Sequence, residues 1–326
     1  MDCIGKSMLA LDIALSVSTL HPVIPSMRCY RETPGNVMVL SYEDSAENIK
    51  RRLYASAERS GIVQEMKQAF DENRLHFYFP ETPVFTQTID GMIVPTPLFH
   101  EIDRESARIK PALIIFDPYS AVSTSPENDN NGGAQVGQFL NALAGKHNCG
   151  VLVLHHVAKS RVDDDGHLAM RGNTELPSKA RWIARLLSID GDHDRLRLHI
   201  AKDSYHQRID DVFFQRTLSG ALKELTREAL STETDAIRNR VVDFIAKNPE
   251  LKISKNAVRL NNSKAARALV DSIGATPAQV HDAIVSALKA HYLVEETRKK
   301  PNGREQKILI CESNYDSEEY ADEAPF

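Results

Sequence analysis

The chain has 326 residues, which predicts about two domains with buried cores. Its net charge of −5 excludes a protein that is basic throughout. Its 4 cysteines lack the C-x-x-C spacing of a zinc ribbon, and they are too few for a disulfide scaffold. No apolar run reaches the roughly 18 residues of a membrane span, so we expect a cytoplasmic protein.

Apolar runs alternate with helical patterns over residues 1–225. Three of the runs are continuous, which is typical of parallel strands buried on both faces: 37–40, 112–116 and 151–154. Helical patterns cover residues 7–18, 45–59, 62–72, 97–109 and 133–147, and the stretches 183–190 and 195–201 predict an antiparallel hairpin. This order predicts an α/β sheet with right-handed crossovers. Polar loops at 124–133 and 158–170 are expected at the ligand-binding edge, with solvated linkers as the alternative.

Residues 231–311 have a different pattern. Ser231–Thr234 supplies an N-cap for a helix at 235–247. Helical patterns follow at 255–260, 263–273 and 277–290, and two strand-like runs follow at 292–297 and 306–310. Helices followed by a hairpin around Asn302-Gly303 predict a small α+β winged helix-turn-helix domain. This segment carries 14 basic and 9 acidic side chains, whereas the tail 312–326 carries 6 acidic and no basic ones and is expected to be disordered.

The first chemical motif is Gly5-Lys6-Ser7, which matches the end of the P-loop G-x-x-x-x-G-K-[ST]. In a P-loop the backbone N–H groups and the lysine hold phosphates, and the hydroxyl ligates Mg²⁺. The first glycine of the motif would fall one residue before Met1, so we expect a sheet whose first strand is missing and, if residue 1 is the true start, weak ATP binding. The alternative is an ordinary helix start that carries a lysine.

Acidic residues follow two of the strand-like runs. The run 112–116 ends in Asp117, as in a Walker B strand that delivers a carboxylate to Mg²⁺, although Asp-Pro also begins turns. Glu43 follows the run 37–40, where a carboxylate can orient an attacking water. The alternative there is a cap, supplied by Asp44 or Ser45, for the next helix.

Three further positions carry chemistry. His156, after the run 151–154, is interpreted as a γ-phosphate sensor, with a surface or core histidine or a metal site as alternatives. Arg171 beside Gly172 predicts an arginine finger toward a neighbouring subunit, or a surface arginine. Lys202 would contact phosphate at the end of the hairpin, or only end the strand.

The order of these motifs over residues 3–205 resembles that of the RepA-like replicative helicase ATPases of the RecA fold. The matching segments are GKSMLALDIA, VMVLSYEDS, LIIFDP, VLVLHHVAKS, RGN and ARW, although Asn173 departs from the small residue that the family has there. The resemblance implies a hexamer-type ring that hydrolyses ATP with Mg²⁺ between subunits and acts on DNA. It assigns nucleotide contacts to Gly5, Lys6, Ser7 and Lys202, Mg²⁺ ligation to Ser7 and Asp117, and roles as base, sensor and finger to Glu43, His156 and Arg171.

The expected winged helix is basic mainly in its wing. The helix 277–290 is not strongly basic, whereas the wing suits contacts to DNA phosphates through Arg298, Lys299, Lys300 and Arg304. A winged helix that binds protein is the alternative. For the whole chain, two other functions stay open: a recombination or repair ATPase without unwinding, and a DNA-binding regulator on a degenerate ATPase scaffold.

The acidic tail is expected to compete with DNA for the basic wing. Deletion of residues 312–326 should therefore tighten DNA binding at low salt, because fewer carboxylates then screen the wing. Fluorescence anisotropy with labelled DNA at about 50 mM salt measures this affinity. An affinity equal to that of the full chain contradicts the idea.

Overall fold

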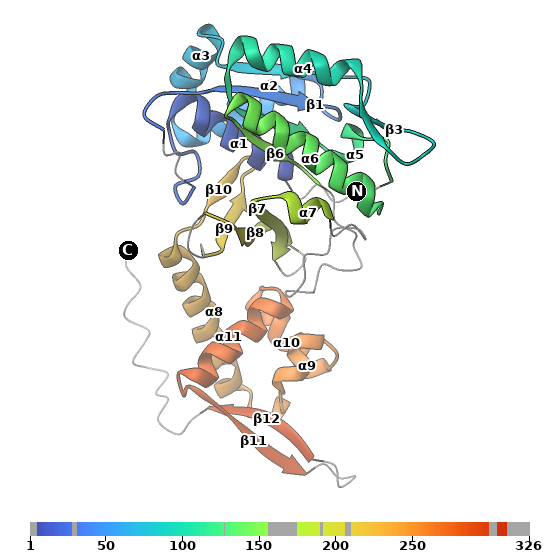
Figure 1. Ribbon diagram of the computed structural model, residues 1–326. Coiled ribbons are helices and arrows are strands. Elements are labelled where there is room, and N and C mark those ends of the chain that lie inside the picture. The colour runs from blue at the N-terminus through green and yellow to red at the C-terminus, as the bar shows by residue number, and fades with distance from the viewer. Residues whose placement is uncertain are drawn as a thin grey trace. The chain divides into compact units, whose positions relative to one another are not determined.

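The computed structural model describes residues 5–27, 31–126, 128–155, 175–189, 192–205, 210–299 and 305–311. The chain divides into two compact units, Met1–Glu224 and Leu225–Phe326, referred to below as unit 1 and unit 2 (Figure 1). Within the described ranges, no helix combines the length and the apolar character needed to cross a membrane.

Unit 1 contains a parallel sheet in the order β2-β1-β5-β6. Its strands are β1 (Asn36–Ser41), β2 (Leu75–Tyr78), β5 (Pro111–Asp117) and β6 (Gly150–Val153). The helices of the unit are α1 (Lys6–Thr19), α2 (Ala46–Ser60), α3 (Val63–Asp71), α4 (Pro97–Ile109), α5 (Tyr119–Val122), α6 (Asn130–His147) and α7 (Glu175–Lys179). The parallel α/β sheet predicted from the sequence is confirmed.

Antiparallel strands complete unit 1. A second sheet has the order β10-β9-β8-β7, with β7 (Trp182–Ile189), β8 (Asp192–Asp203), β9 (Val212–Arg216) and β10 (Leu222–Glu224). β7 pairs antiparallel with β8, so the predicted hairpin is confirmed. A separate two-stranded ribbon, β3 (Phe85–Gln87) and β4 (Ile93–Pro95), precedes α4 and was not predicted from the sequence.

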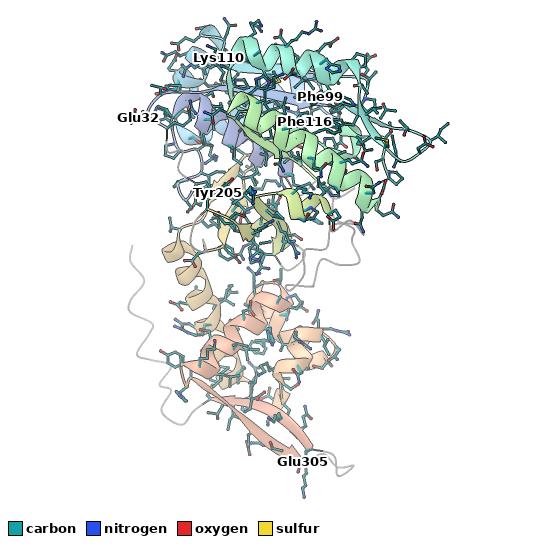
Figure 2. The ribbon with its side chains drawn as sticks, viewed as in Figure 1. Glu32, Phe99, Lys110, Phe116, Tyr205 and Glu305 are labelled. Carbon is teal, nitrogen blue, oxygen red and sulfur yellow. The ribbon has the colours of Figure 1, made fainter. Side chains whose placement is uncertain are left out.

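Strand β1 is apolar without interruption because helices cover both faces of its sheet. Val37 and Val39 belong to a core that includes residues of α1, α2 and α3. Met38 and Leu40 point to the opposite face and belong to a core with residues of α4 and α6. Alternate side chains of one strand thus supply two cores, as the period of a β-strand requires. Figure 2 shows one of these core residues, Phe116 of β5, among the packed side chains of unit 1.

Helix α1 lies between the two larger sheets. Ala10, Leu11 and Leu15 pack in the core beneath the parallel sheet. Met8 and Leu9 pack against the antiparallel sheet, in a cluster with Phe214. A helix with two packed faces is expected to be apolar around its circumference, as the segment KSMLALDIALSVST is.

The predicted polar loop at 124–133 is helical from Asn130 on, so that prediction was wrong in part. Helix α6 begins at Asn130, because the Asp129 side chain accepts a hydrogen bond from the Asn131 amide at 3.0 Å and so caps the helix. The Ser125 hydroxyl and the Gln87 side-chain amide also donate to Asp129, at 3.0 Å and 2.6 Å. Hydrogen bonds between separate elements, which a local pattern does not show, hold this segment. The loop predicted at 158–170 lies outside the described residues.

Unit 2 consists of helices followed by an antiparallel hairpin. The elements are α8 (Arg227–Lys247), η2 (Pro249–Leu251), α9 (Lys255–Leu260), α10 (Lys264–Ile273), α11 (Pro277–Lys289), β11 (Leu293–Lys299) and β12 (Glu305–Cys311). Glu305 lies at the outer end of the hairpin (Figure 2). Helices α9, α10 and α11 are capped at their N-termini by the side chains of Ser254, Ser263 and Thr276, respectively. The N-cap predicted at Ser231–Thr234 was wrong: α8 begins at Arg227, because the good helix formers Glu228, Ala229 and Leu230 extend it upstream.

One charged side chain is enclosed between α1 and α2. Asp12 is 0% exposed, accepts a hydrogen bond from the Ser56 hydroxyl, and has its Oδ2 atom 3.7 Å from Nη2 of Arg59. Burial raises the pKa of Asp12 to about 7, and the contacts with Ser56 and Arg59 offset that rise only in part. The carboxyl group therefore retains its proton in the folded chain at pH values where it loses the proton in the unfolded chain.

We expect the stability of the chain to fall as pH rises from about 4 to about 7, and Asp12→Asn to remove this loss. Because the folded state holds a proton that the unfolded state has lost, each unit rise in pH lowers the free energy of unfolding by up to about 1.4 kcal/mol. This loss ends above the folded-state pKa. Urea unfolding of both proteins between pH 4.5 and 8 measures the difference, with the exposed Asp71→Asn as the control. A difference between Asp12→Asn and the parent chain that is independent of pH contradicts the assignment.

Candidate active site

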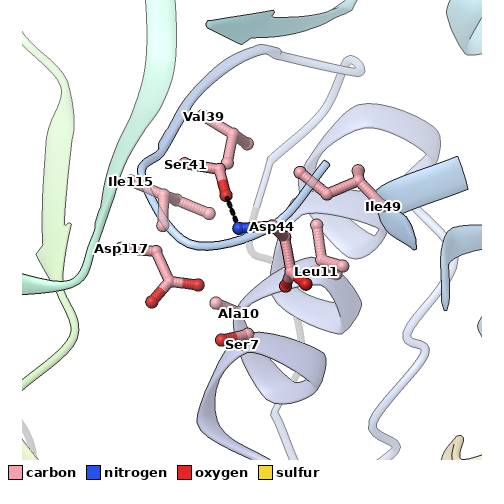
Figure 3. A pocket seen from close by; sticks show the side chains of 9 residues that line it. All are labelled: Ser7, Ala10, Leu11, Val39, Ser41, Asp44, Ile49, Ile115 and Asp117. Carbon is pink, nitrogen blue, oxygen red and sulfur yellow. Dashed lines mark hydrogen bonds between the residues drawn. The ribbon is translucent and has the colours of Figure 1, made fainter. Parts of the chain in front are cut away.

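The carboxyl ends of β1 and β5 bring three of the predicted residues together. Ser41 pairs in register with Asp117, so the residues that follow β1 lie beside the end of β5. The first turn of α1 faces the same edge and places Ser7 there (Figure 3). A pocket of about 10 Å³ lies between them, with a polar rim of Ser7, Ser41, Asp44 and Asp117 over an apolar floor of Ala10, Leu11, Val39, Ile49 and Ile115.

Asp117 lies in an environment that favours its protonated form. Burial raises the pKa of Asp117, and the negative charges of Glu43 and Asp44 raise it further. The Ser7 hydroxyl, which hydrogen-bonds the carboxylate, and the Arg52 guanidinium lower it. A divalent cation would stabilise the ionised carboxylate of Asp117 in the same way as Arg52 does, but from within the site.

The donor set suits Mg²⁺ that is shared with a phosphate. A hydroxyl and one carboxylate are the protein ligands that such an ion takes, while phosphate and water oxygens complete its octahedron. Ser7 and Asp117 are adjacent and supply these two groups. Among the residues that the structure describes, no group of three or more His, Cys, Asp and Glu side chains is placed to hold a metal ion by itself.

In the turn after β1, a serine and neither of the two acidic residues caps the next helix. The Ser45 hydroxyl accepts a hydrogen bond from the Asn48 amide at 3.3 Å, so Ser45 is the cap of α2. Asp44 pairs with Arg52, and its amide donates to the Ser41 hydroxyl at 3.4 Å. Glu43 is left with an exposed side chain whose charge still acts on Asp117.

Gly5 and Lys6 form the start of α1. Gly5 has φ of +93°, a left-handed conformation that glycine adopts without strain. The Nη2 atom of Arg216 lies 3.3 Å from the position that a Cβ atom at Gly5 would occupy. Arg216 also donates to the His193 carbonyl at 3.3 Å and lies 3.3 Å from Asp194. A guanidinium from β9 therefore stands beside Gly5-Lys6, and no pattern in the sequence around residue 216 indicates it.

The other predicted site residues are not brought to this edge by contacts in the described part of the chain. His156 and Arg171 lie outside the described residues; the neighbouring His155 stacks on Tyr119, with ring centroids 5.1 Å apart. The Lys202 ammonium donates to the carbonyl oxygens of Pro177 and Ser178, at 3.4 Å and 3.2 Å. Lys202 thus contacts α7 and not the Ser7–Asp117 pair.

The predicted DNA contacts of the wing are described in part. Arg298 donates through Nη2 to Glu296 at 2.7 Å, which reduces the charge it offers to a phosphate. Lys299 is exposed, and Lys300 and Arg304 lie outside the described residues. The pairing of Arg298 could not be predicted from the spacing of basic residues alone.

Residues 3–162 match the family model of the AAA domain. The match supports an AAA-type P-loop domain in this part of the chain. The AAA domain has a RecA-like parallel sheet, and C-terminal to it lies a further α/β region, unit 2. The crystal structure of the RadB recombinase is similar with a TM-score of 0.43 and 19% sequence identity, and the alignment covers 68% of this chain and 86% of that chain. A likeness of this size does not carry the activity of RadB over to this chain.

Membership of the AAA domain implies use of ATP and Mg²⁺, which makes Asp117 a direct test of the site. We expect Asp117→Asn to abolish the Mg²⁺ dependence of ATP binding, because the amide cannot offset the charge of the ion. Titration of a fluorescent ATP analogue with and without Mg²⁺ measures this, and Asp71→Asn on the surface of α3 is the matched control. Equal Mg²⁺ dependence in the Asp117 variant and the parent chain would remove Asp117 from the site.

Proposed function

We propose that the chain is an ATPase that hydrolyses ATP at subunit interfaces and acts on DNA, as the RepA-like replicative helicases do. The observation that carries the proposal is the meeting of Ser7, Glu43 and Asp117 at the edge of the parallel sheet. This is the place where α/β sheets bind ligands, and it lies at the start of a helix, where backbone N–H groups favour an anion.

Each residue has a part that follows from its position. The first turn of α1 and Lys6 would hold the β- and γ-phosphates, while the hydroxyl of Ser7 and the carboxylate of Asp117 would hold Mg²⁺. When bound, Mg²⁺ neutralises charge on the phosphate oxygens. Glu43 is the exposed carboxylate at this edge, and it would orient a water in line with the γ-phosphate and accept its proton.

The remaining contributions come from neighbouring copies and from unit 2. Arg171 would reach the nucleotide of the next subunit in a hexamer-type ring. Lys202, whose ammonium contacts α7 within its own chain, would contact a nucleotide phosphate. His156 would sense the γ-phosphate at the end of β6. Unit 2 has the element order of a winged helix-turn-helix, and its wing, including Lys299, Lys300 and Arg304, would contact DNA phosphates.

The proposal is tested by ATP hydrolysis with and without single-stranded DNA. Lys6→Ala is expected to abolish hydrolysis, and Glu43→Gln to slow it by about 10²–10⁴-fold while ATP binding is retained, because only the positioning of water is lost. Glu58→Gln and Lys67→Ala are matched controls, since both side chains are exposed on neighbouring helices.

The outcomes separate the alternatives. Hydrolysis with strand displacement supports a helicase, whereas hydrolysis without displacement indicates a recombination-type ATPase. No hydrolysis in the parent chain, or hydrolysis that persists in Lys6→Ala, contradicts the proposal and favours a DNA-binding regulator built on an inactive ATPase domain.

A further inference from the structure

The segment 251–270 of unit 2 carries cations without any acidic residue. It contains five of the basic side chains of the unit, Lys252, Lys255, Arg259, Lys264 and Arg267, and no Asp or Glu. The segment runs from Leu251 of η2 through α9 into α10 (Figure 1). Four of its five cations lie on α9 and α10, and Lys252 lies just before α9. The last turn of α10 lies beyond the segment and carries the exposed Asp271.

Among the residues that the structure describes, four of these five cations have no carboxylate partner. Lys252, Arg259, Lys264 and Arg267 are exposed, and none of them makes an ion pair with any residue for which the structure gives a position. Lys255 differs, because its Nζ atom lies 4.0 Å from Glu295 of β11. We call the four exposed cations the α9–α10 face.

The turn between the helices brings the cations of this face together. Lys264 and Arg267 are one helical turn apart on α10 and lie on the same side of it. The Nε atom of Arg267 donates to the Asn261 carbonyl at 3.3 Å, which holds the guanidinium against the end of α9, two residues beyond Arg259. Like charges gathered in this way repel one another, and a bound polyanion removes that repulsion.

The described residues of the wing and helix α11 offer less positive charge to a polyanion than this face does. In the wing, Arg298 is paired with Glu296, and Lys307 lies 3.9 Å from Glu295. Helix α11 exposes Asp282 as well as Lys289. The α9–α10 face has only one large exposed apolar side chain, Leu260 at 60%, which is little for a protein interface, whose core is apolar.

We propose that the α9–α10 face binds the phosphate backbone of duplex DNA, in addition to the wing. The proposal rests on the DNA-binding part of the proposed function and not on ATP hydrolysis. Because contacts to phosphates position a protein without reading bases, this face would bind duplexes of different sequence with similar affinity.

The test is the salt dependence of binding to a labelled duplex by the full chain without nucleotide. In Lys264→Gln/Arg267→Gln the slope of log K against log [salt] is expected to become shallower by about 1.8, since each lost phosphate contact removes about 0.9. Lys67→Gln/Arg104→Gln, which removes two exposed cations of unit 1, is the matched control and should keep the parent slope. Thermal unfolding verifies that the variants are folded. If the double variant does not fold, the single variants Arg259→Gln and Lys264→Gln replace it in the binding measurement.

Several results would overturn the proposal. The first is a double variant whose slope and affinity for the duplex equal those of the parent chain. The second is an equal loss of slope and affinity in the control variant, and the third is a parent chain that does not bind the duplex. The fourth is a double variant that binds polyglutamate more weakly than the parent chain does but binds DNA equally well. ATP hydrolysis, measured on the same variants, should be unchanged. Failure of the ATPase in the parent chain leaves the DNA measurement valid, so the two proposals fail separately.

Discussion

The burial of helix α1 between two sheets is the constraint on which the candidate site depends. Met8 and Leu9 pack against the antiparallel sheet, while Leu11 and Leu15 pack beneath the parallel one. Because close-packed interiors do not deform continuously, neither face can shift without opening a cavity. The first turn of α1, with Ser7, is therefore held at a fixed position relative to Asp117 at the end of β5.

The same helix carries a buried carboxyl group where it packs against α2. Asp12 contacts Ser56 and Arg59, both of which lie on α2. Helix α2 follows directly on the turn that contains Glu43, so a polar contact in the core connects the phosphate-facing and the water-orienting parts of the site. Burial raises the pKa of Asp12 more than the charge of Arg59 lowers it, because the ion pair offsets only part of the cost of burying the carboxylate.

The sequence predicted those parts of the molecule that depend on local pattern. The continuous apolar runs correctly indicated β1, β5 and β6, and the acidic residues after β1 and β5 indicated the edge where they meet. Arg216 was not found, because it reaches the site from β9, which is distant in the chain. Arg52 was not found either, because no local pattern relates it to Asp117 at the end of β5. β3 and β4 have only three residues each, too short for a period to be recognised, and the contact of Gln87 in β3 with Asp129 is equally non-local.

The segment after Asp117 has little freedom to rearrange. Gly132 lies so close to Ser125 that a Cβ atom there would overlap the serine hydroxyl, and Ser125 and Gln87 are both fixed to Asp129 by hydrogen bonds. The described residues of the loop that leads from β5 to α6 are thus held by contacts within the chain. Residues held in this way need little further ordering when a ligand binds, so less of its affinity is lost to loop ordering on that side.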